Sequence, residues 1–513
     1  MTQTPGRLAG RLAVLPVWAR AILAFGAGAV GALAQEPYGI TPLVLASMVA
    51  GFALLPMVTT WQSAVRIGWF FGTGYFALCL TWIVEPFQVD AAQHGWMAPF
   101  ALVLLSAGLA LFWGAAFGLA KRLGPSRWWL AATWPLAEIG RAYVFTGFPW
   151  AMPPQALVNV VAGQGLAWVG PHGMMLALCL IAALLSRPIV MRFGVAIQST
   201  LALISLAVLL VSPVAPQAAM TEHTIRIVQP NAAQHEKWDP QMIPVFVDRQ
   251  VGFTAQPGDV DLILWPETAL PYLVEHAQVV FDRIAEASSG KPVALGIQRR
   301  SEQGYFNSMV VLDEAGQVTQ TYDKHHLVPF GEYMPFPSLF SKINVGGLAD
   351  RVDGAFISGP GPQLLDMGSL GRALPLICYE AVFAHDVGGA AVRPDFLMQL
   401  TNDAWFGAFA GPQQHLAQAR MRAIEQGLPL VRSANTGISA MIDPNGRITD
   451  QIPLDQAGFV DAALPRPLAP TLYSRTGDLP IIGFLVMATL LMAIKNTLLM
   501  AIKKRTVRTP FQD

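Results

Sequence analysis

Residues 374–383 read LPLICYEAVF, an apolar run that leads to Cys378 and is followed directly by Tyr379 and Glu380. A short apolar run that stops at polar residues is typical of a buried β-strand. In α/β folds, the groups that bind and react gather beyond the carboxyl ends of strands. The segment therefore predicts a strand that delivers a cysteine to the edge of a sheet.

The surrounding block, residues 220–470, has the length of an ordinary domain and a mixed polar and apolar composition. Short apolar or alternating runs between turn signals predict strands, and longer amphipathic stretches predict helices between them. The expected strands are TIRIVQ, DLILW, PVALGI, SMVVLD, ALPLIC, FLMQL, LPLVRS and ISAMID, and the expected helices are PQMIPVFVDRQVGFTAQ, AQVVFDRIAEASS and QQHLAQARMRAIEQG. This order predicts a layered α/β domain.

The rest of the chain has the composition of a membrane protein. Of the 513 residues, 53% are hydrophobic and 13% are charged, against about 25% charged in an average soluble domain. A helix needs about 20 mostly apolar residues to cross a bilayer, and eight segments meet this need, near residues 13–34, 39–58, 65–86, 97–120, 128–146, 164–186, 194–214 and 479–494. We expect transmembrane helices 1 to 7 in residues 1–219, the α/β domain in 220–470, and helix 8 with a cytoplasmic tail in 471–513.

Basic residues indicate the orientation, because Lys and Arg next to helix ends stay cytoplasmic. The opposite set of helix ends, near QEPYG and EPFQVDAAQHG, is acidic or neutral apart from Arg141. The basic set comprises Arg7, Arg11, Arg20, Arg66, Lys121, Arg122, Arg127, Arg187, Arg192, Lys503, Lys504, Arg505 and Arg508. Both termini are therefore expected in the cytoplasm, and the 220–470 domain in the periplasm of a bacterium. The formal net charge is zero, so no basic surplus predicts nucleic-acid binding.

The first apolar segment has two further features. Arg7 and Arg11, an apolar core and the sequence ALAQ at residues 32–35 also fit a cleavable secretory signal, whose removal would leave the domain placement unchanged. GAGAVG at residues 26–31 matches the dinucleotide fingerprint, but it lies inside an apolar span rather than after a strand. Small residues there favour close helix packing, so the sequence indicates no nucleotide.

Cys378 is the one cysteine of the 220–470 domain, whereas Cys79 and Cys179 fall in apolar spans. Cysteines in an oxidising compartment usually pair, so a lone cysteine in an exported domain is a candidate reactive thiol. A cysteine nucleophile needs a base to accept its proton and a cation to stabilise its anion. The alternative is a small buried hydrophobic residue.

Two further segments supply a base and a cation. LILWPETALP places Glu267 just after a strand-like run, and YDKHHLVPFGEYMP supplies Lys324 and a second carboxylate, Glu332. Taken singly, Glu267 could be a helix-start or surface carboxylate and Lys324 a solvated side chain. His325 and His326 suggest metal ligands, but neighbours in an extended segment point to opposite faces, and the ligand spacing of a metal site is missing.

LWPETALP, YDKHHLVPFGEYMP and LICYEAVF, in this order and each at a strand end, resemble the motifs of the nitrilase superfamily, whose fold is an αββα sandwich. Eight spans around such a domain resemble one branch, the apolipoprotein N-acyltransferase family of the bacterial inner membrane. The resemblance covers nearly the whole chain and includes GFPW (147–150), NDAWFG (402–407), ARMRAIEQGLPLVRSANTGISAMID (419–443) and YSRTGD (473–478).

The resemblance implies a two-step acyl transfer without a cofactor. Glu267 would be the general base, Lys324 the electrostatic stabiliser, and Cys378 the nucleophile that takes the sn-1 chain of a phospholipid, typically phosphatidylethanolamine, as a thioester. The α-amino group of the S-diacylglyceryl cysteine of an apolipoprotein would then accept the chain, which completes lipoprotein maturation. The Lys324 ammonium would lower the pKa of the thiol and face the oxyanion, with the N–H of Tyr379 as a second donor.

The same resemblance implies roles for residues around this triad. Glu332 and Glu380 look like additional active-site carboxylates, and Tyr379 like a neighbour that shapes the pocket. Trp238 in KWDP and Asn307 in FNSM look like substrate contacts, although Trp238 is also readily explained as a core residue.

Two apolar segments are expected to meet the membrane. GFPW, with Trp150 as a substrate-side residue, would project from the periplasmic membrane face, and FGEYMPFPSLF at residues 330–340 would dip into lipid. Ordinary core packing is the alternative for both.

Two other functions remain open on the sequence. A membrane-tethered amidase of the nitrilase type would share the triad but use water as the acyl acceptor. A transporter or receptor would need charged groups along a pathway in the spans, where chiefly Glu138 and Arg141 occur. These two lie three residues apart on a helix and could equally pair with each other.

Overall fold

The computed structural model describes residues 15–186, 192–211, 218–335 and 356–507. The chain forms two compact units. The first, a helical unit, contains Met1–Val84, Met97–Val214 and Arg475–Asp513, and the second, an α/β unit, contains Glu85–Trp96 and Ala215–Ser474.

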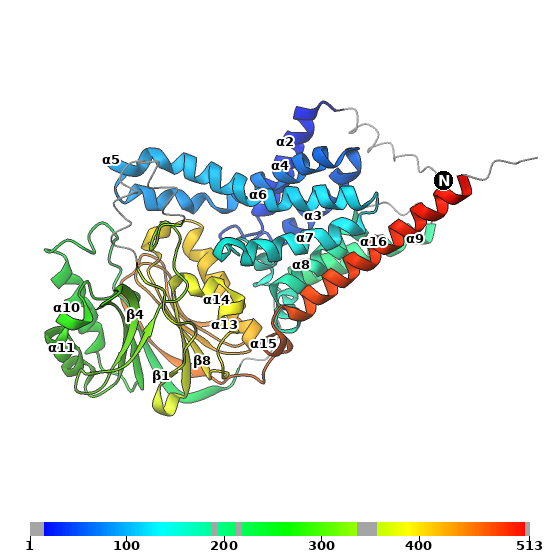
Figure 1. Ribbon diagram of the computed structural model, residues 1–513. Coiled ribbons are helices and arrows are strands. Elements are labelled where there is room, and N and C mark those ends of the chain that lie inside the picture. Colours follow the sequence, from blue (N-terminus) through cyan, green and yellow to red (C-terminus); the bar gives the residue numbers. More distant parts are fainter. Residues whose placement is uncertain (1–14, 187–191, 212–217, 336–355, 508–513) are drawn as a thin grey trace, which may run out of the picture. The chain divides into compact units, whose positions relative to one another are not determined.

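The α/β unit is built on two six-stranded sheets, with the orders β12-β1-β2-β3-β4-β5 and β11-β10-β9-β8-β7-β6 (Figure 1). The strands are β1 (Met220–Gln229), β2 (Leu262–Leu264), β3 (Val293–Ser301), β4 (Gly304–Leu312), β5 (Val318–Asp323), β6 (Leu365–Asp366), β7 (Arg372–Ile377), β8 (Phe396–Thr401), β9 (Leu430–Ala434), β10 (Ser439–Ile442), β11 (Ile448–Ile452) and β12 (Gly458–Pro465). β1, β2 and β3 are parallel, as are β7, β8 and β9. Parallel neighbours need crossover segments. The four crossovers contain α10 (Ile243–Thr254), α11 (Gln278–Ser288), the short α13 (Ala384–Val387) and α14 (Gly411–Gln426).

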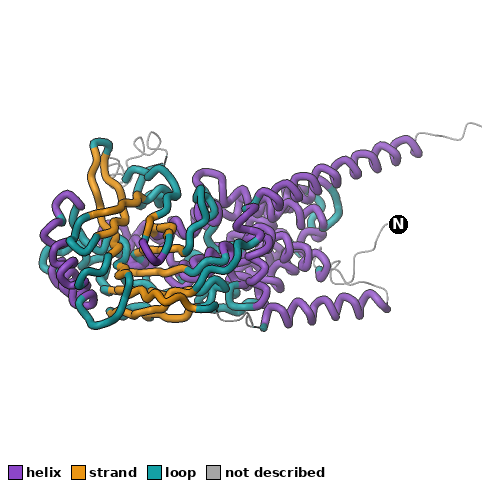
Figure 2. Tube along the Cα trace, turned by 90° about the horizontal axis from the view of Figure 1, so that it is seen from below, coloured by secondary structure: helices purple, strands orange, loops and turns teal. Residues whose placement is uncertain are grey.

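The two sheets share one core, and helices cover their outer faces, so the unit is an αββα sandwich (Figure 2). β7 shows why its sequence is continuously apolar. Ala373 and Ile377 belong to the core between the sheets, whereas Leu374 and Leu376 belong to the cluster under α14. A strand that is buried on both faces has no position for a polar residue.

All eight predicted strands and the three predicted helices of this unit are present. The strands that the sequence did not predict are β5, β6, β11 and β12, and these are the outer strands of the two sheets. An edge strand exposes one side, so it tolerates polar residues, as VTQTYD and ITDQI illustrate. The hydrophobic pattern therefore identifies the central strands and misses the edges.

In the helical unit, every predicted apolar segment contains a helix. The helices are α2 (Val17–Ala32), α3 (Pro42–Leu54), α4 (Trp61–Cys79), α6 (Ala98–Leu123), α7 (Trp128–Tyr143), α8 (Leu166–Leu185), α9 (Arg192–Leu210) and α16 (Leu479–Val507). Among the described residues, Ala91–Leu123 and Val161–Leu185 are long and apolar enough to cross a membrane, and the bent pair Trp61–Cys79 with Thr81–Gln88 would make a third span. Several other apolar helices are shorter than a full span, so the number of eight stays a prediction.

A buried ion pair joins Glu138 and Arg141 at 2.6 Å within α7, as the alternative to a transport pathway anticipated. Trp113 of α6 donates its indole N–H to Glu138 at 2.6 Å. The Arg141 guanidinium also donates to the backbone carbonyls of Phe148 and Trp150. The pair is thus satisfied inside the protein.

These bonds overturn the expectation for GFPW. The Trp150 side chain is 1% exposed and packs against the ring of Trp82, with centroids 4.6 Å apart, so it does not project from the unit. The reason is that Arg141 holds the carbonyls of this loop against the buried ion pair.

Candidate active site

Cys378 follows directly on β7 and opens a short 3₁₀ helix, Cys378–Val382. Its φ of +52° lies in the left-handed region, which costs a non-glycine residue about 1–3 kcal/mol and is concentrated at functional sites. The residue is 7% exposed. The turn therefore holds a nearly buried thiol at the carboxyl end of a central strand.

Glu267 lies three residues beyond β2, again at a carboxyl strand end. Its carboxylate is nearly buried and accepts hydrogen bonds from the backbone N–H of Asn402 at 2.9 Å and from Nδ2 of Asn307 at 2.8 Å. Gly296 on β3 makes room for it, because a β-carbon there would lie 2.6 Å from the Glu267 Cα. The carboxylate is thus held by both sheets.

Lys324 follows the end of β5 and is 1% exposed. Its Nζ lies 3.6 Å from Glu267 Oε1 and 2.9 Å from the carboxylate of Glu332. Burial lowers the pKa of Lys324, but the charges of Glu332, Glu267 and Cys378 outweigh burial and hold that pKa above its ordinary value. The side chain is therefore a permanent ammonium.

Burial raises the pKa of the Cys378 thiol, and the Glu267 carboxylate raises it further. Lys324 lowers this pKa, as expected, but it does not compensate for the other two effects. Lys324 therefore acts on this pKa in the expected direction, but burial, the largest effect, and the Glu267 charge make the net shift a rise. The resting nucleophile is a thiol, and its proton must leave during attack.

Asn307 and Glu332 connect the triad from one side. The Asn307 amide nitrogen donates to Glu267 at 2.8 Å and to Glu332 at 3.0 Å, so it spaces the two carboxylates. Glu332 also accepts from the backbone N–H of Val328. The Asn307 amide oxygen is buried and has no hydrogen-bond partner among the described residues, which leaves one polar atom for a substrate.

Glu380 is completely buried and ties the cysteine turn to the lysine loop. Its carboxylate accepts from the Tyr322 hydroxyl and from the backbone N–H groups of Ile377, His325 and His326. Tyr379 is 5% exposed. Its ring packs edge-on against His326 and Phe383. Because Glu380 bonds both segments, it fixes the loop that begins at Lys324 against the turn that carries Cys378.

The His325 ring lies between two carboxylates, 2.6 Å from Glu380 and 3.6 Å from Asp386. Burial lowers the pKa of His325, but Asp386 and Glu380 outweigh burial and raise the pKa to about 9. The pKa of His325 is about 9 in the folded protein and near 6.5 in the unfolded chain. Protonated His325 therefore stabilises the fold fully at pH values below 6.5, and this stabilisation is lost as the pH rises through 9.

We expect the α/β unit to lose roughly 3 kcal/mol of stability between pH 6.5 and 9.5 from this group. The measurement is the thermal unfolding temperature of the purified protein across that range. His325→Gln should flatten the dependence, and an unchanged slope in this variant would contradict the assignment.

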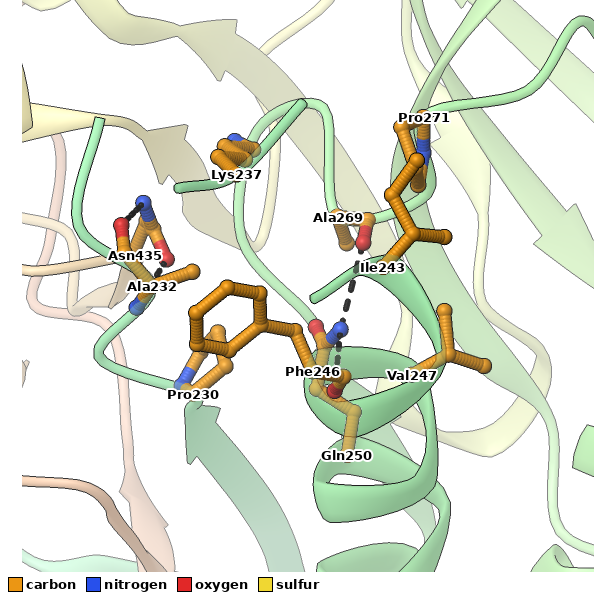
Figure 3. A pocket seen from close by; sticks show the side chains of 10 residues that line it. All are labelled: Pro230, Ala232, Lys237, Ile243, Phe246, Val247, Gln250, Ala269, Pro271 and Asn435. Carbon is orange, nitrogen blue, oxygen red and sulfur yellow. Dashed lines mark hydrogen bonds between the residues drawn. The ribbon is translucent and has the colours of Figure 1, made fainter. Parts of the chain in front are cut away.

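Lys237, next to Trp238 in KWDP, is a neighbour of the triad that the sequence did not predict. It is 5% exposed, and its Nζ donates to the backbone carbonyl of Glu267 at 3.2 Å. Burial lowers the pKa of Lys237 to about 8, although Glu267 opposes this. Lys237 lines a pocket whose wall also includes Ala269, two residues after Glu267, and Phe246 and Gln250 of α10 (Figure 3). Trp238 is 46% exposed, so it is not a core residue.

Two further expectations concern the surroundings of the site. Residues 336–340 of the segment expected to dip into lipid lie outside the described residues. Within the described ranges, no three His, Cys, Asp or Glu side chains are grouped so as to hold a metal ion.

The structure therefore brings Glu267, Lys324 and Cys378 into one nearly buried cluster, drawn from three strand ends of two sheets. The carboxylate and the ammonium lie 3.6 Å apart, and both charges act on the thiol. These are the three groups that nucleophilic catalysis through a covalent intermediate requires. The local sequence predicted Glu267 and Cys378 from the strand-like runs before them, and it predicted Lys324 from the segment YDKHHLVPFGEYMP. It contained no signal for Lys237 beyond the proximity of Trp238.

Comparison with known proteins gives two family matches that together span most of the chain. Residues 27–184 match the apolipoprotein N-acyltransferase N-terminal domain, and residues 175–471 match the carbon-nitrogen hydrolase family.

Curated relatives match over nearly their full length. The apolipoprotein N-acyltransferase of Rhodopseudomonas palustris is 35% identical over 533 aligned residues, which cover 96% of this chain and 98% of that protein. The protein of the same name from Brucella suis is 38% identical, with 90% and 93% covered. Among solved structures, an amidase from Nesterenkonia sp. AN1 with a covalent adduct at its active-site cysteine aligns at 19% identity with a TM-score of 0.35, covering 50% of this chain and 94% of that one.

Proposed function

The chain belongs to the apolipoprotein N-acyltransferase family, and from this premise we propose that it moves the sn-1 acyl chain of a phospholipid to an apolipoprotein. The acyl chain would first form a thioester with Cys378 and would then pass to the α-amino group of the acceptor's S-diacylglyceryl cysteine. The observation that carries the proposal is the contact of Lys324 with Glu267 at 3.6 Å, with both charges acting on the Cys378 thiol.

In the first step, Glu267 takes the thiol proton while the Cys378 sulfur attacks the sn-1 ester carbonyl. The carbonyl oxygen becomes an oxyanion, which the Lys324 ammonium and the N–H of Tyr379 stabilise. The tetrahedral intermediate then expels the glycerol oxygen, which takes the proton back from Glu267. The products are a lysophospholipid and a thioester.

In the second step, the free α-amino group attacks the thioester carbonyl. Such a group has a pKa of roughly 8, so a fraction of it is neutral at pH 7. Glu267 accepts the proton that the nitrogen loses and returns it to the departing sulfur. An amide is more stable than a thioester, so this step runs in one direction.

Glu332 and Glu380 would support this chemistry in different ways. Glu332 pairs with Lys324 and so sets the position of the ammonium charge. Glu380 bonds the N–H groups of Ile377, just before Cys378, and of His325, just after Lys324, and so holds these two segments together. Asn307 has its amide oxygen left for substrate, and the exposed ring of Trp238 suits an acyl chain or an acceptor peptide.

The membrane arrangement belongs to the same proposal. We place eight spans in residues 1–219 and 471–513 of an inner-membrane protein, with both termini in the cytoplasm and the catalytic domain 220–470 in the periplasm. The distribution of Lys and Arg supports this orientation. Both substrates are held by acyl chains at about 0.8 kcal/mol per buried CH₂, so the site must meet them at the outer leaflet.

The test uses the purified protein in vesicles of phosphatidylethanolamine with a deuterated sn-1 chain, together with a synthetic S-diacylglyceryl peptide. We expect the labelled chain as an amide on the peptide and one lysophospholipid per amide, measured by mass spectrometry. A lipid labelled at sn-2 should give an unlabelled peptide, and phosphatidylglycerol in its place reports the headgroup preference. Labelled free fatty acid without peptide acylation would establish the water-accepting alternative instead.

A further inference from the structure

Four completely buried polar side chains lie behind Cys378 and have no part in the mechanism above. They are Gln399 at the middle of β8, Asp403 in NDAWFG, His415 of α14 and Arg432 of β9, each with 0% exposure. Burying polar groups in this number is costly unless they are bonded to one another. Their hydrogen bonds form one chain that ends at the backbone of the nucleophile.

Asp403 is the anchor of this chain. Arg432 donates to its Oδ2, Thr401 donates to its Oδ1 at 3.0 Å, and Nδ1 of His415 lies 2.9 Å from Oδ1. Burial raises the pKa of Asp403, but Arg432 and His415 outweigh burial and lower it to about 2. Burial and then the Arg432 charge lower the pKa of His415. A carboxylate therefore faces a neutral imidazole.

A neutral imidazole carries one N–H. Whether this N–H is at Nδ1 or at Nε2 determines the direction of the remaining hydrogen bonds toward Cys378. We assign it to Nδ1, which faces the Asp403 carboxylate. Nε2 is then an acceptor, and one N–H of the Gln399 amide reaches it at 3.3 Å. The other N–H of Gln399 reaches the Cys378 carbonyl, also at 3.3 Å. The amide bridges His415 Nε2 and the Cys378 oxygen, which are 3.2 Å apart.

The Cys378 carbonyl and the Tyr379 N–H belong to one planar peptide group and point in opposite directions. A donor on the carbonyl fixes the plane of this group, and it also polarises the group so that the N–H becomes a stronger donor. The same peptide group follows a residue in a strained left-handed conformation, so its orientation needs support.

We propose that Gln399, aligned by Asp403 and His415, is a positioning residue that orients and polarises the Cys378–Tyr379 peptide for oxyanion stabilisation. The inference rests on the proposed acyl transfer, because only a step with an oxyanion uses this N–H. It gives a role to NDAWFG and to the segment around His415, which the catalytic triad does not explain.

Two reactions of the same thiol separate this role from a general structural one. Acylation by phosphatidylethanolamine passes through an oxyanion. Alkylation by iodoacetamide does not, because the sulfur forms its bond to carbon as iodide leaves. We expect Gln399→Leu to slow acylation roughly tenfold to a hundredfold, somewhat less than removal of a whole oxyanion donor, while alkylation of Cys378 stays within about twofold of wild type.

Rates are expressed per alkylatable Cys378, so a loss of folded protein does not count as a loss of catalysis. His415→Gln retains an amide that can bond both Asp403 and Gln399, and it should keep more acylation than His415→Phe. Gln229→Leu is the matched control, because Gln229 is an equally buried glutamine of β1 that bonds Pro453 and Gln456 instead. It should leave acylation per thiol unchanged.

The inference is overturned if Gln399→Leu is acylated at the wild-type rate, or if acylation and alkylation fall by the same factor. The second result would mean that Gln399 affects the reactivity or accessibility of the Cys378 thiol and not the stabilisation of the oxyanion. If the wild-type thiol is alkylated but never acylated by phospholipid, the proposed function fails and this inference fails with it.

Discussion

Replacing Cys378 with alanine is expected to abolish both the acyl adduct and the N-acylated peptide, a loss on the order of 10⁴-fold or more. The α/β unit contains no other cysteine, since Cys79 and Cys179 are buried in α4 and α8 of the helical unit. The measurement is mass spectrometry of the trapped protein and of the peptide product.

The same variant should fold. Alanine keeps the β-carbon and the backbone conformation that Cys378 already adopts, and it leaves only a small void in place of the sulfur. Cys79→Ala is the matched control, because it removes an equally buried thiol far along the sequence and should retain activity. N-acylation of the peptide by the Cys378→Ala protein would end the thioester mechanism.

Replacing Lys324 with methionine is expected to have the second-largest effect, and it should act on rate and stability together. Acylation should fall roughly 10²–10³-fold, because the oxyanion loses its cation. The thiol pKa should rise further, since the Lys324 charge lowers it in the wild type. Stability should fall by about 3–5 kcal/mol, as for a buried charge left without its partner, because Glu267 and Glu332 would face each other across Asn307.

A second substitution separates these two effects. Lys324→Met combined with Glu332→Gln removes one of the two uncompensated carboxylates, so we expect it to restore part of the unfolding temperature but none of the acylation rate. Lys291→Met is the control, because Lys291 is 39% exposed and 3.8 Å from Asp259. Full activity in Lys324→Met would show that the ammonium is structural.

The sequence predicted those parts of the fold that hydrophobic patterns determine. Central strands such as β7 are buried on both faces and appear as apolar runs, whereas the edge strands β5, β6, β11 and β12 carry polar residues and were missed. Glu267 and Cys378 were predicted because each follows a strand-like run, whereas Lys324 was predicted from the segment YDKHHLVPFGEYMP. The structure places their charges together.

Other features depend on contacts between distant segments. Gln399 and His415 are ordinary polar residues in the sequence, and only the fold brings them to the Cys378 carbonyl. Trp150 was expected to project, and the bonds of Arg141 to its loop explain why it is buried. The net pKa of the thiol could not be predicted either, because it depends on how burial and two opposite charges balance.

The ion pair of Glu138 and Arg141, with Trp113 bonded to it, has a consequence for biogenesis. A lone helix with two ionisable side chains enters a bilayer at a high free-energy cost, but here a neighbour on α6 completes the bonding of the acid. Translation delivers α6 immediately before α7. If the two helices insert together as a hairpin, the charges enter the bilayer already paired and bonded, so α7 is expected to depend on α6 for its integration.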